Sequence, residues 1–474
     1  MSKPPIYLVA NEIWEKGYCN LPFGIMYVGR ALTDAGFPVR LFHLHRGEEK
    51  ILYDEVQRQK PLFVGVSTII GSTLSRDIEI SMRLKAMGQK LVWGGVFASM
   101  APEQVLGGGF VDFVVRGEAE HSAPKLAEAI LADSAPRNIP GVCWLEHGQF
   151  MSNPGCEWPQ DLDQFQPGWE LIDLKQYFRK FANRDDYCWQ VIFSRGCPHS
   201  CAFCYNRLDD ERKRWRTNSP AYWDDQLAYL EKHLPARIGV LSLAGDNAFG
   251  DEGKAWEMIE HFRRPWAAVG RIELVGDDFV RRCRETRAVY LGFGLESGSE
   301  RMLKVYNKGI TSAQAMTAIE KLASINAVQD VGIIFFGPGE TLEDRRLTVE
   351  FMEKARAANP YLYFAVNPFW AFPGTPLWEK VLEQGWRPPA NLHEWSTRFL
   401  DFMEVHGWDR RKWGRAYGAA RRLYGFPRAW GETVPSWSRG ILYSRLHNFQ
   451  FNYPIEEVLR FAYRTYYLGR KRPL

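Results

Sequence analysis

Three cysteines stand close together directly after an apolar run, and this arrangement constrains the fold more than any other feature. Cys197, Cys201 and Cys204 form a C-x3-C-x2-C pattern, and the run from Trp189 to Phe193 predicts a buried strand before them. Thiolates are the natural ligands of iron–sulfur clusters, and three of them can hold three irons of a 4Fe–4S cube. The fourth iron then keeps an open position for a chelating small molecule. A zinc knuckle is the alternative, but it needs a fourth protein ligand at short spacing, and His199 falls inside the loop.

This loop resembles the cysteine motif of the radical S-adenosylmethionine (radical SAM) superfamily. In that family the open iron of the 4Fe–4S cluster binds the amino and carboxylate groups of SAM. Phe203 stands where the family has an aromatic residue beside the adenine. The resemblance therefore implies a 4Fe–4S cluster and SAM as cofactors, with Cys197, Cys201 and Cys204 as metal ligands and catalytic residues.

Residues 1–135 alternate apolar runs with helix-like segments, which predicts an α/β domain with a Rossmann-like, doubly wound parallel sheet. We expect strands at 6–10, 39–42, 63–68, 90–93 and 113–115, and helices at 21–35 and 120–131. Ligands of such sheets bind at the carboxyl ends of the strands. Seven residues fall at these ends: Ser67, Thr68, Gly94, Gly95, Arg116, Gly117 and Glu118.

The order of these pieces resembles the cobalamin-binding domain that precedes many radical SAM cores. The resemblance rests on Pro22-x-Gly24, Gly65-x-Ser67, Gly94-Gly95 and Val115-Arg116-Gly117-Glu118. It implies cobalamin as a third cofactor, contacted by the seven residues named above. The chain has no D-x-H-x-x-G, so the resemblance implies base-off cobalamin without a histidine ligand. A Rossmann-like domain that binds no ligand is the alternative.

Residues 136–185 predict a hairpin with its turn at His147-Gly148, followed by a linker rich in Pro, Asp and Gln. Residues 186–400 again alternate strands and helices. Six repeats fit the partial (βα)6 TIM barrel that the radical SAM resemblance implies, and in such a barrel the chemistry gathers at the carboxyl ends of the strands. We expect the strands at 189–194, 238–243, 272–275, 289–293, 331–336 and 363–368.

Residues at three of these strand ends match positions that contact SAM in the family: Gly245, Asp246, Glu296, Ser297, Gly337 and Gly339. The resemblance makes Asp246 the acceptor of the SAM amino group and Glu296 a contact of its ribose or methionine part. The two glycines of the fifth strand end would let the backbone approach the adenine. The structural alternatives are a turn at Asp246 and a carboxylate near a helix N-terminus at Glu296.

Residues 401–474 predict a mainly helical region that is basic and aromatic. From residue 405 onward fourteen Lys or Arg stand against four Asp or Glu, with fifteen aromatic residues between them. Residues 457–468 are expected to form an amphipathic helix, and 469–472 a basic tail. A helical cap with a solvated charged face is the plain interpretation. The alternatives are a surface for an anionic, small-molecule or lipid-like substrate, or a peripheral contact with an anionic membrane.

The cysteine pattern and the net charge indicate the cellular location of the protein and the kinds of partner that it binds. The eight cysteines show no paired spacing outside the triad, which favours a reducing, cytoplasmic location over a disulfide framework. The first residues run straight into a predicted strand, so we expect no secretory leader. The net charge of +4 is too small to indicate nucleic acid as a partner, and no RNA-binding module is visible.

The two resemblances together imply a cobalamin-dependent radical SAM C-methyltransferase. In such enzymes a 5′-deoxyadenosyl radical removes a hydrogen atom from an unactivated carbon, and methylcobalamin supplies the methyl group. A flavodoxin- or ferredoxin-type protein donates the electron that the cluster needs. A ring-forming enzyme like the anaerobic cyclase of bacteriochlorophyll synthesis is the alternative. A methylthiotransferase is less favoured, because those enzymes carry three more N-terminal cysteines and only Cys19 lies before residue 135. A non-enzymatic cobalamin sensor or carrier would leave the cysteine loop without a purpose.

Overall fold

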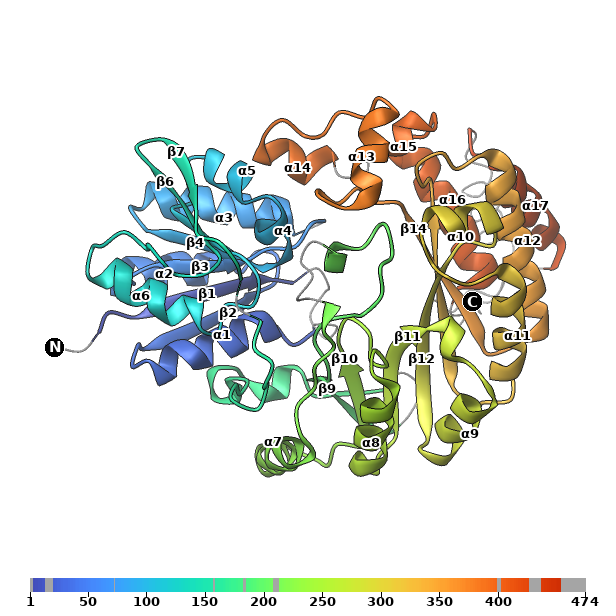
Figure 1. Cartoon of the computed structure of the whole chain (residues 1–474), viewed down its shortest axis with the longest axis horizontal. Coiled ribbons are helices and arrows are strands. Elements are labelled where there is room, and N and C mark those ends of the chain that lie inside the picture. The colour runs from blue at the N-terminus through green and yellow to red at the C-terminus, as the bar shows by residue number, and fades with distance from the viewer. Residues whose placement is uncertain are drawn as a thin grey trace, which may run out of the picture. The chain divides into compact units, whose positions relative to one another are not determined.

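The chain divides into two compact units, and its elements are labelled in Figure 1. The computed structural model describes residues 3–12, 20–71, 73–156, 158–181, 185–207, 213–398, 402–425 and 436–452. The first unit comprises Met1–Pro198, Leu208–Asp246 and Pro388–Phe399, and the second comprises His199–Arg207, Asn247–Arg387 and Leu400–Leu474. The predicted helix at 457–468 and the basic tail lie outside the described residues.

The first unit contains a seven-stranded sheet in the order β2-β1-β3-β4-β5-β6-β7. The strands from β1 to β5 pair in parallel, and β6 and β7 add an antiparallel hairpin next to β5. The hairpin turns at His147 and Gly148, as predicted, and both have positive φ, at 52° and 80°. The strands are β1 (Ile6–Asn11), β2 (Val39–Leu44), β3 (Val64–Ser67), β4 (Leu91–Gly94), β5 (Phe113–Val115), β6 (Val142–Glu146) and β7 (Gln149–Ser152).

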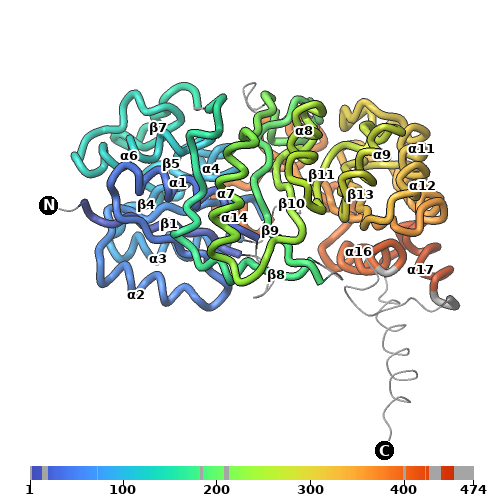
Figure 2. The backbone as a smooth tube through the Cα atoms, turned by 90° about the horizontal axis from the view of Figure 1, so that it is seen from below, coloured from blue at the N-terminus to red at the C-terminus, as the bar shows by residue number. Residues whose placement is uncertain are grey.

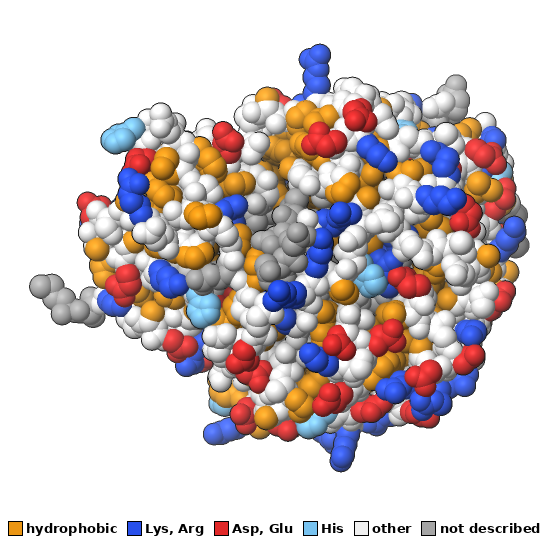
Figure 3. Space-filling view, viewed as in Figure 1, with side chains coloured by type: hydrophobic (Ala, Val, Ile, Leu, Met, Phe, Trp, Pro, Cys, Tyr) orange, Lys and Arg blue, Asp and Glu red, His pale blue; other side chains and the backbone are white. Residues whose placement is uncertain are grey.

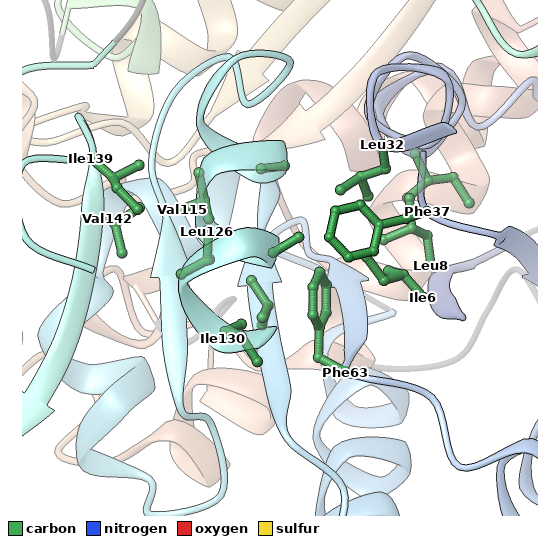
Figure 4. Packing of buried hydrophobic residues seen from close by; sticks show 14 of the residues in the cluster. Ile6, Leu8, Leu32, Phe37, Phe63, Val115, Leu126, Ile130, Ile139 and Val142 are labelled. Atoms are coloured by element: carbon green, nitrogen blue, oxygen red, sulfur yellow. The ribbon is translucent and has the colours of Figure 1, made fainter. Parts of the chain in front are cut away.

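Helices cover both faces of this sheet, which confirms the doubly wound fold. Figure 2 shows α1 and α6 on one side of the sheet and α2 and α3 on the other. The core shown in Figure 4 includes Leu8, Leu32, Phe63 and Leu126, all buried. Burial of each such side chain stabilises the fold by about 1.5–3 kcal/mol. The helices are α1 (Phe23–Asp34), α2 (Glu49–Gln59), α3 (Leu74–Ala86), α4 (Gly95–Met100), α5 (Pro102–Gly107) and α6 (Ser122–Leu131).

The predicted linker after the hairpin is part of the first unit and packs within it. Trp169 is buried, and its indole N–H donates to Gln226 Oε1 at 2.8 Å. The strands that follow continue in the same unit, with β8 antiparallel to β9 and β9 parallel to β10. The elements are η1 (Trp169–Leu171), η2 (Leu174–Gln176), β8 (Arg179–Lys180), β9 (Tyr187–Ile192), α7 (Pro220–His233), β10 (Val240–Ala244) and α14 (Leu392–Arg398).

The second unit carries four parallel strands, each next to its sequence neighbour, in the order β14-β13-β12-β11. Figure 1 shows α11 and α12 lying along one side of these strands. The strands are β11 (Trp266–Arg271), β12 (Ala288–Glu296), β13 (Val328–Phe335) and β14 (Leu362–Pro368). The helices are η3 (Tyr205–Arg207), α8 (Glu252–Phe262), η5 (Ile272–Leu274), α9 (Asp277–Glu285), α10 (Glu300–Val305), α11 (Ser312–Leu322), α12 (Leu342–Ala358), α13 (Pro376–Glu383), α15 (Phe402–Val405), α16 (Arg410–Tyr424) and α17 (Ser436–Asn448).

Six parallel strands, β9 to β14, therefore alternate with helices, which confirms the partial (βα)6 barrel. The predicted third strand at 272–275 is wrong, because the strand is β11 and Ile272–Leu274 forms a 3₁₀ helix. The small residues Ala267, Ala268 and Gly270 weaken the strand pattern of β11, although both alanines are buried. The described C-terminal segments are helical, as expected. No helix in the described ranges is long and apolar enough to cross a membrane.

Candidate functional site

The cysteine loop begins with a backbone bend that the end of β10 supports. Gly196 has a φ of +86°, and its N–H donates to Asp246 Oδ2 at 3.0 Å. Gly245 must be glycine, because a Cβ there would lie 2.6 Å from the backbone oxygen of Ser194. The structure thus places Gly245 and Asp246 beside the residue before Cys197. Their contact with SAM stays a prediction, but one oxygen of Asp246 orients the loop.

Two acidic residues after β5 hold the arginine that precedes this bend. Arg195 Nη1 lies 3.1 Å from Glu118 Oε2 and 2.6 Å from Glu120 Oε1, and its guanidinium stacks 4.6 Å above the Tyr27 ring. Arg216 Nη2 donates to Glu118 Oε1 at 2.6 Å. Burial alone would lower the pKa of Arg195, but Glu120 and Glu118 outweigh it and raise that pKa. Glu118, predicted as a cobalamin contact, therefore pairs with two arginines.

The ends of β3 and β4 form a tight backbone corner. Gly95 has a φ of +89°, and a Cβ on it would lie 2.6 Å from the Thr68 carbonyl oxygen and 3.3 Å from Ser67 Oγ. The Thr68 hydroxyl donates to the Gly94 carbonyl at 2.9 Å. The structure thus brings together Ser67, Thr68, Gly94 and Gly95 at the edge where doubly wound sheets bind ligands.

The remaining two predicted cobalamin residues support the segment after the hairpin. Arg116 Nη2 donates to the Asn153 carbonyl at 2.9 Å, and the Gly117 N–H donates to Ser99 Oγ at 3.1 Å. Gly117 has a φ of +78°, and a Cβ there would lie 2.8 Å from Cys156 Cβ. These contacts give both residues a structural role, and their role toward cobalamin stays a prediction.

The half-buried Asn11, which ends β1, and the buried Asp77 of α3 went unnoticed in the sequence. Asn11 Nδ2 donates to Asp77 Oδ1 at 2.6 Å, and burial raises the pKa of Asp77 to about 7. Among the described residues, Asn11 Oδ1 and Asp77 Oδ2 are buried acceptors without a hydrogen-bond partner. Such atoms at the ligand edge of the sheet suit a ligand that offers N–H groups. Cobalamin carries a rim of primary amides, so these residues and the Gly95 corner fit it.

The later part of the cysteine loop is anchored within the second unit. The Ala202 N–H donates to the Tyr306 carbonyl at 2.9 Å, and the Ala202 carbonyl accepts from the Leu377 N–H at 3.2 Å. A turn brings the Cys204 N–H to the Cys201 carbonyl at 3.2 Å. Cys201 is buried and Cys204 is half-buried. Backbone hydrogen bonds to Tyr306 and Leu377, together with the turn inside the loop, therefore hold both cysteines.

A buried arginine lies against one of these cysteines. Arg271 ends β11, and its Nη1 donates to Cys201 Sγ at 2.9 Å. The same guanidinium donates to the Glu273 carboxylate and to the Lys308 carbonyl. Sequence reasoning missed Arg271 because the strand was expected to begin after it. A correct strand boundary is the signal that would have placed it at a strand end.

One buried lysine lies near two predicted SAM residues, Glu296 at the end of β12 and Phe203 in the cysteine loop. Glu296 has a φ of +78°, and the pairing with β13 shifts register between Gly294 and Glu296. Such irregularities re-aim side chains and are common beside active sites. Lys308 Nζ lies 3.3 Å from Glu296 Oε1 and 6.0 Å from the centroid of the Phe203 ring. Phe203 and Glu296 thus share one buried lysine.

The other three predicted SAM residues have internal roles. Ser297 is fully buried, and its hydroxyl lies 3.0 Å from Thr348 Oγ1. A Cβ on Gly337 would lie 2.1 Å from Tyr306 Oη, so close packing requires glycine there. Gly339 has a φ of +71°. The burial of Ser297 gives no support to a ligand contact, whereas the two glycines stay predictions.

The cysteine loop suits a cluster better than a single metal ion. In the part of the chain that the structure describes, no three His, Cys, Asp or Glu side chains converge on one point. A zinc ion requires such convergence, because four ligands share one ion. A cubane cluster does not, because each thiolate binds a different iron. Three thiols in one loop with the bend at Gly196 therefore fit the cluster.

Comparison with protein families finds two matching models along the chain. The radical SAM superfamily model matches residues 191–352, which include the cysteine loop and the strands up to β13. The B12 binding domain model matches residues 15–127, which include β2 to β5. Both matches fall where the sequence motifs and the two sheets predict them.

Curated relatives include both methyltransferases and cyclases. An uncharacterized methyltransferase of Pyrococcus horikoshii is 27% identical over 65% of this chain and 66% of that protein. The anaerobic magnesium-protoporphyrin IX monomethyl ester cyclase of Synechocystis is 28% identical over 64% of this chain and 62% of that protein. The hopanoid C-3 methylase of Methylococcus capsulatus is 29% identical over 66% of this chain and 60% of that protein. The matches thus span less than two thirds of these relatives' length.

Solved structures share the fold at low sequence identity. The cobalamin-dependent SAM radical enzyme OxsB, with aqua-cobalamin and SAM bound, has a TM-score of 0.70 and 14% identity over 99% of this chain and 82% of that chain. The radical SAM methyltransferase TsrM from Kitasatospora setae has a TM-score of 0.64 and 16% identity over 84% and 82%. The two domain models imply a 4Fe–4S cluster with SAM, and cobalamin, as cofactors. The chain thus carries a B12-binding domain within residues 15–127, followed by a radical SAM domain within residues 191–352.

Proposed function

We propose that this protein is a cobalamin-dependent radical SAM C-methyltransferase that acts on an unactivated carbon. The observation that carries the proposal is the ion pair between Glu118, after the last parallel strand of the first sheet, and Arg195, just before the cysteine loop. It ties the end of the B12-binding domain to the start of the cluster motif within one unit. When bound, the cluster and SAM supply the means to remove a hydrogen atom from the substrate, and cobalamin carries the methyl group.

The chain's own residues orient these groups. Asp246 accepts a hydrogen bond from the Gly196 N–H, which holds its carboxylate at the end of β10. The resemblance to the radical SAM family implies that the SAM ammonium meets this carboxylate in a charge-assisted hydrogen bond. Lys308 is buried and pairs with Glu296, so this carboxylate is held at the end of β12 to accept hydrogen bonds from ligand hydroxyl groups. Fixed acceptors of this kind bind a ligand in one orientation at low cost in entropy.

The substrate that we propose is an anionic small or lipid-like molecule. Support comes from α16, which carries Arg410, Arg411, Lys412 and Arg415 beside Trp413. On the face drawn in Figure 3, lysine and arginine side chains are interspersed with aspartate and glutamate. A mixed face of this kind does not favour nucleic acid, which needs a basic stripe. A peripheral membrane contact through α16 would serve a lipid-like substrate, and a flavodoxin- or ferredoxin-type protein would donate the electron.

A ring-forming cyclase is the second candidate. The Synechocystis cyclase is 28% identical over 64% of this chain, a match of the same quality as the methyltransferase matches. A cyclase with this site would use the same cluster loop and SAM residues. It differs in that no methyl group from SAM appears on cobalamin or in a product.

Methyl transfer from labelled SAM distinguishes the two candidates. The anaerobic, cluster-reconstituted protein is incubated with hydroxocobalamin, a reductant and SAM that carries a deuterated methyl group. Mass spectrometry should find the deuterated methyl group on cobalamin in the wild-type protein. Cys201→Ala should bind cobalamin but lose reductive SAM cleavage. Reductive SAM cleavage without any labelled methylcobalamin would contradict the methyltransferase and favour the cyclase.

A further inference from the structure

Arg271 connects the end of β11 to the middle cysteine of the loop. Its Nη1 lies 2.9 Å from Cys201 Sγ, and its side chain is about nine-tenths buried. We propose that Arg271 is a positioning residue of the 4Fe–4S cluster, which holds the Cys201 sulfur in place and raises the reduction potential of the cluster. The inference rests on cluster binding by this loop and is independent of the reaction that follows SAM cleavage.

The guanidinium is oriented by three contacts that leave it little freedom. Nε donates to Glu273, Nη2 donates to the Lys308 carbonyl, and Nη1 donates to the sulfur. An arginine side chain offers its donors in a rigid planar fork, so two fixed contacts determine the direction of the third. The donor that faces Cys201 is therefore placed before any cluster assembles.

The sulfur is also fixed through its backbone. The residue after Cys201 donates its N–H to the Tyr306 carbonyl at 2.9 Å, and its carbonyl accepts from the Leu377 N–H at 3.2 Å. Cys201 is 8% exposed, so little water competes with the arginine for its sulfur. Hydrogen bonds and charges act more strongly in such a low-dielectric site than at the surface.

The sign of the effect follows from the charge change on reduction. A reduced cluster carries one more negative charge than the oxidised cluster, and part of that charge lies on the thiolate sulfurs. A hydrogen bond from a cation to a ligand sulfur stabilises the reduced form more than the oxidised form. Arg271 therefore makes the cluster easier to reduce.

The same arginine reaches the predicted SAM residues through Lys308. The Lys308 carbonyl accepts from Arg271, and the Lys308 ammonium pairs with Glu296 at 3.3 Å. Cys201, Arg271, Lys308 and Glu296 thus form one continuous set of contacts within the second unit. A change at Arg271 should disturb the Glu296 carboxylate less than the sulfur, because only the sulfur contacts the guanidinium directly.

The test compares four variants of the full chain after anaerobic cluster reconstitution. Arg271→Lys keeps the charge and a donor, Arg271→Gln keeps a donor without the charge, and Arg271→Met keeps neither. The control is Arg282→Met, which removes a guanidinium from α9 that pairs with Glu260 and Asp278. Iron per chain is measured for each variant, and the reduction potential is measured by redox titration followed by electron paramagnetic resonance.

Arg271→Met should lower the equilibrium constant for cluster reduction at least tenfold, which is about 59 mV for a one-electron couple. Arg271→Gln should fall between Met and wild type, Arg271→Lys should recover most of the shift, and Arg282→Met should match wild type. If the Met variant retains no iron, the Gln variant decides the question. A wild-type potential in the Gln or Met variant that holds four irons would overturn the proposal. Absence of iron from the wild-type protein would overturn the cluster assignment as well.

Discussion

Glu118 Oε2 lies 3.1 Å from Arg195 Nη1, and this contact joins the loop after β5 to the residue just before the cysteine loop bend. Arg216 occupies the other oxygen of the same carboxylate at 2.6 Å. The side chains of Glu118, Arg195 and Arg216 are only 15%, 14% and 4% exposed. Because little water reaches them, each charge is stabilised mainly by its ionic partners. The start of the cluster loop is thus held by an acidic residue of the preceding sheet.

Loss of the Glu118 charge should destabilise the first unit. Glu118→Gln leaves Arg216 and part of Arg195 without their ionic partner, and breaking a buried pair costs about 3–5 kcal/mol. The control is Glu128→Gln, whose pair with Lys3 is largely exposed and should be worth less than about 1 kcal/mol. Urea unfolding of both variants checks the difference. Equal unfolding free energies for the two would show that the buried pair is not what holds the loop.

Replacement of the Asp246 carboxylate by an amide should separate its structural role from its role in SAM binding. Asp246→Asn keeps an oxygen that can accept from the Gly196 N–H, and it removes the charge that a SAM ammonium would meet. We expect this variant to hold a full cluster but to bind SAM at least tenfold more weakly, because a charge-assisted hydrogen bond is lost. Asp246→Ala should lose iron as well. Unchanged SAM affinity in the Asn variant would leave Asp246 with the structural role alone.

The Gly95 corner should be essential for cobalamin. Gly95→Ala places a Cβ 2.6 Å from the Thr68 carbonyl oxygen in a backbone with φ of +89°, so the ligand edge must move. Gly109→Ala is the matched control, because Gly109 also has a positive φ, of 77°, but a Cβ there meets nothing within 4 Å. Titration with hydroxocobalamin, followed by absorbance, should show weaker binding for Gly95→Ala only. Equal binding by both variants would place cobalamin elsewhere.

Asp77 should make the stability of the protein depend on pH. Its folded pKa of about 7 exceeds the ordinary value of 3.8, so between these values the folded protein binds more protons than the unfolded chain. Stability from this group therefore falls as the pH rises toward 7, by up to about 1.4 kcal/mol per pH unit. Asp77→Asn keeps the oxygen that accepts from Asn11 and removes the ionisation. Urea unfolding between pH 5.5 and 8 should give a flatter profile for Asp77→Asn, and parallel profiles would refute the buried titration.

The order of strands and helices could be predicted from the sequence because buried parallel strands are continuous apolar runs. β5 was placed at 113–115, as the structure has it, and the hairpin turn at His147-Gly148 followed from residues that tolerate positive φ. β11 was missed because Ala267, Ala268 and Gly270 carry little apolar signal. Because of this error Arg271 was not predicted as a site residue, although it ends β11 and contacts Cys201.

The parts of the candidate site that belong to a local sequence motif could be predicted. The parts that depend on contacts between residues far apart in the sequence could not. The cysteine spacing and the small residues at 94–95 and 245 are local signals. The pairing of Glu118 with Arg195 joins residues 77 positions apart, and the contact of Arg271 with Cys201 joins residues 70 positions apart. No local pattern encodes such contacts. The burial of Ser297 also depends on packing against Thr348 of α12.

The presence of both cofactors on one chain is the central claim, and one sample tests it. Iron and cobalt are quantified in anaerobically purified protein after cluster reconstitution and incubation with hydroxocobalamin, and the visible spectrum is recorded. We predict about four irons and one cobalt per chain, with a base-off cobalamin band, because the three cysteines leave one iron open and no histidine motif offers a lower ligand. Four irons without cobalt would contradict the account and leave a radical enzyme that uses SAM alone.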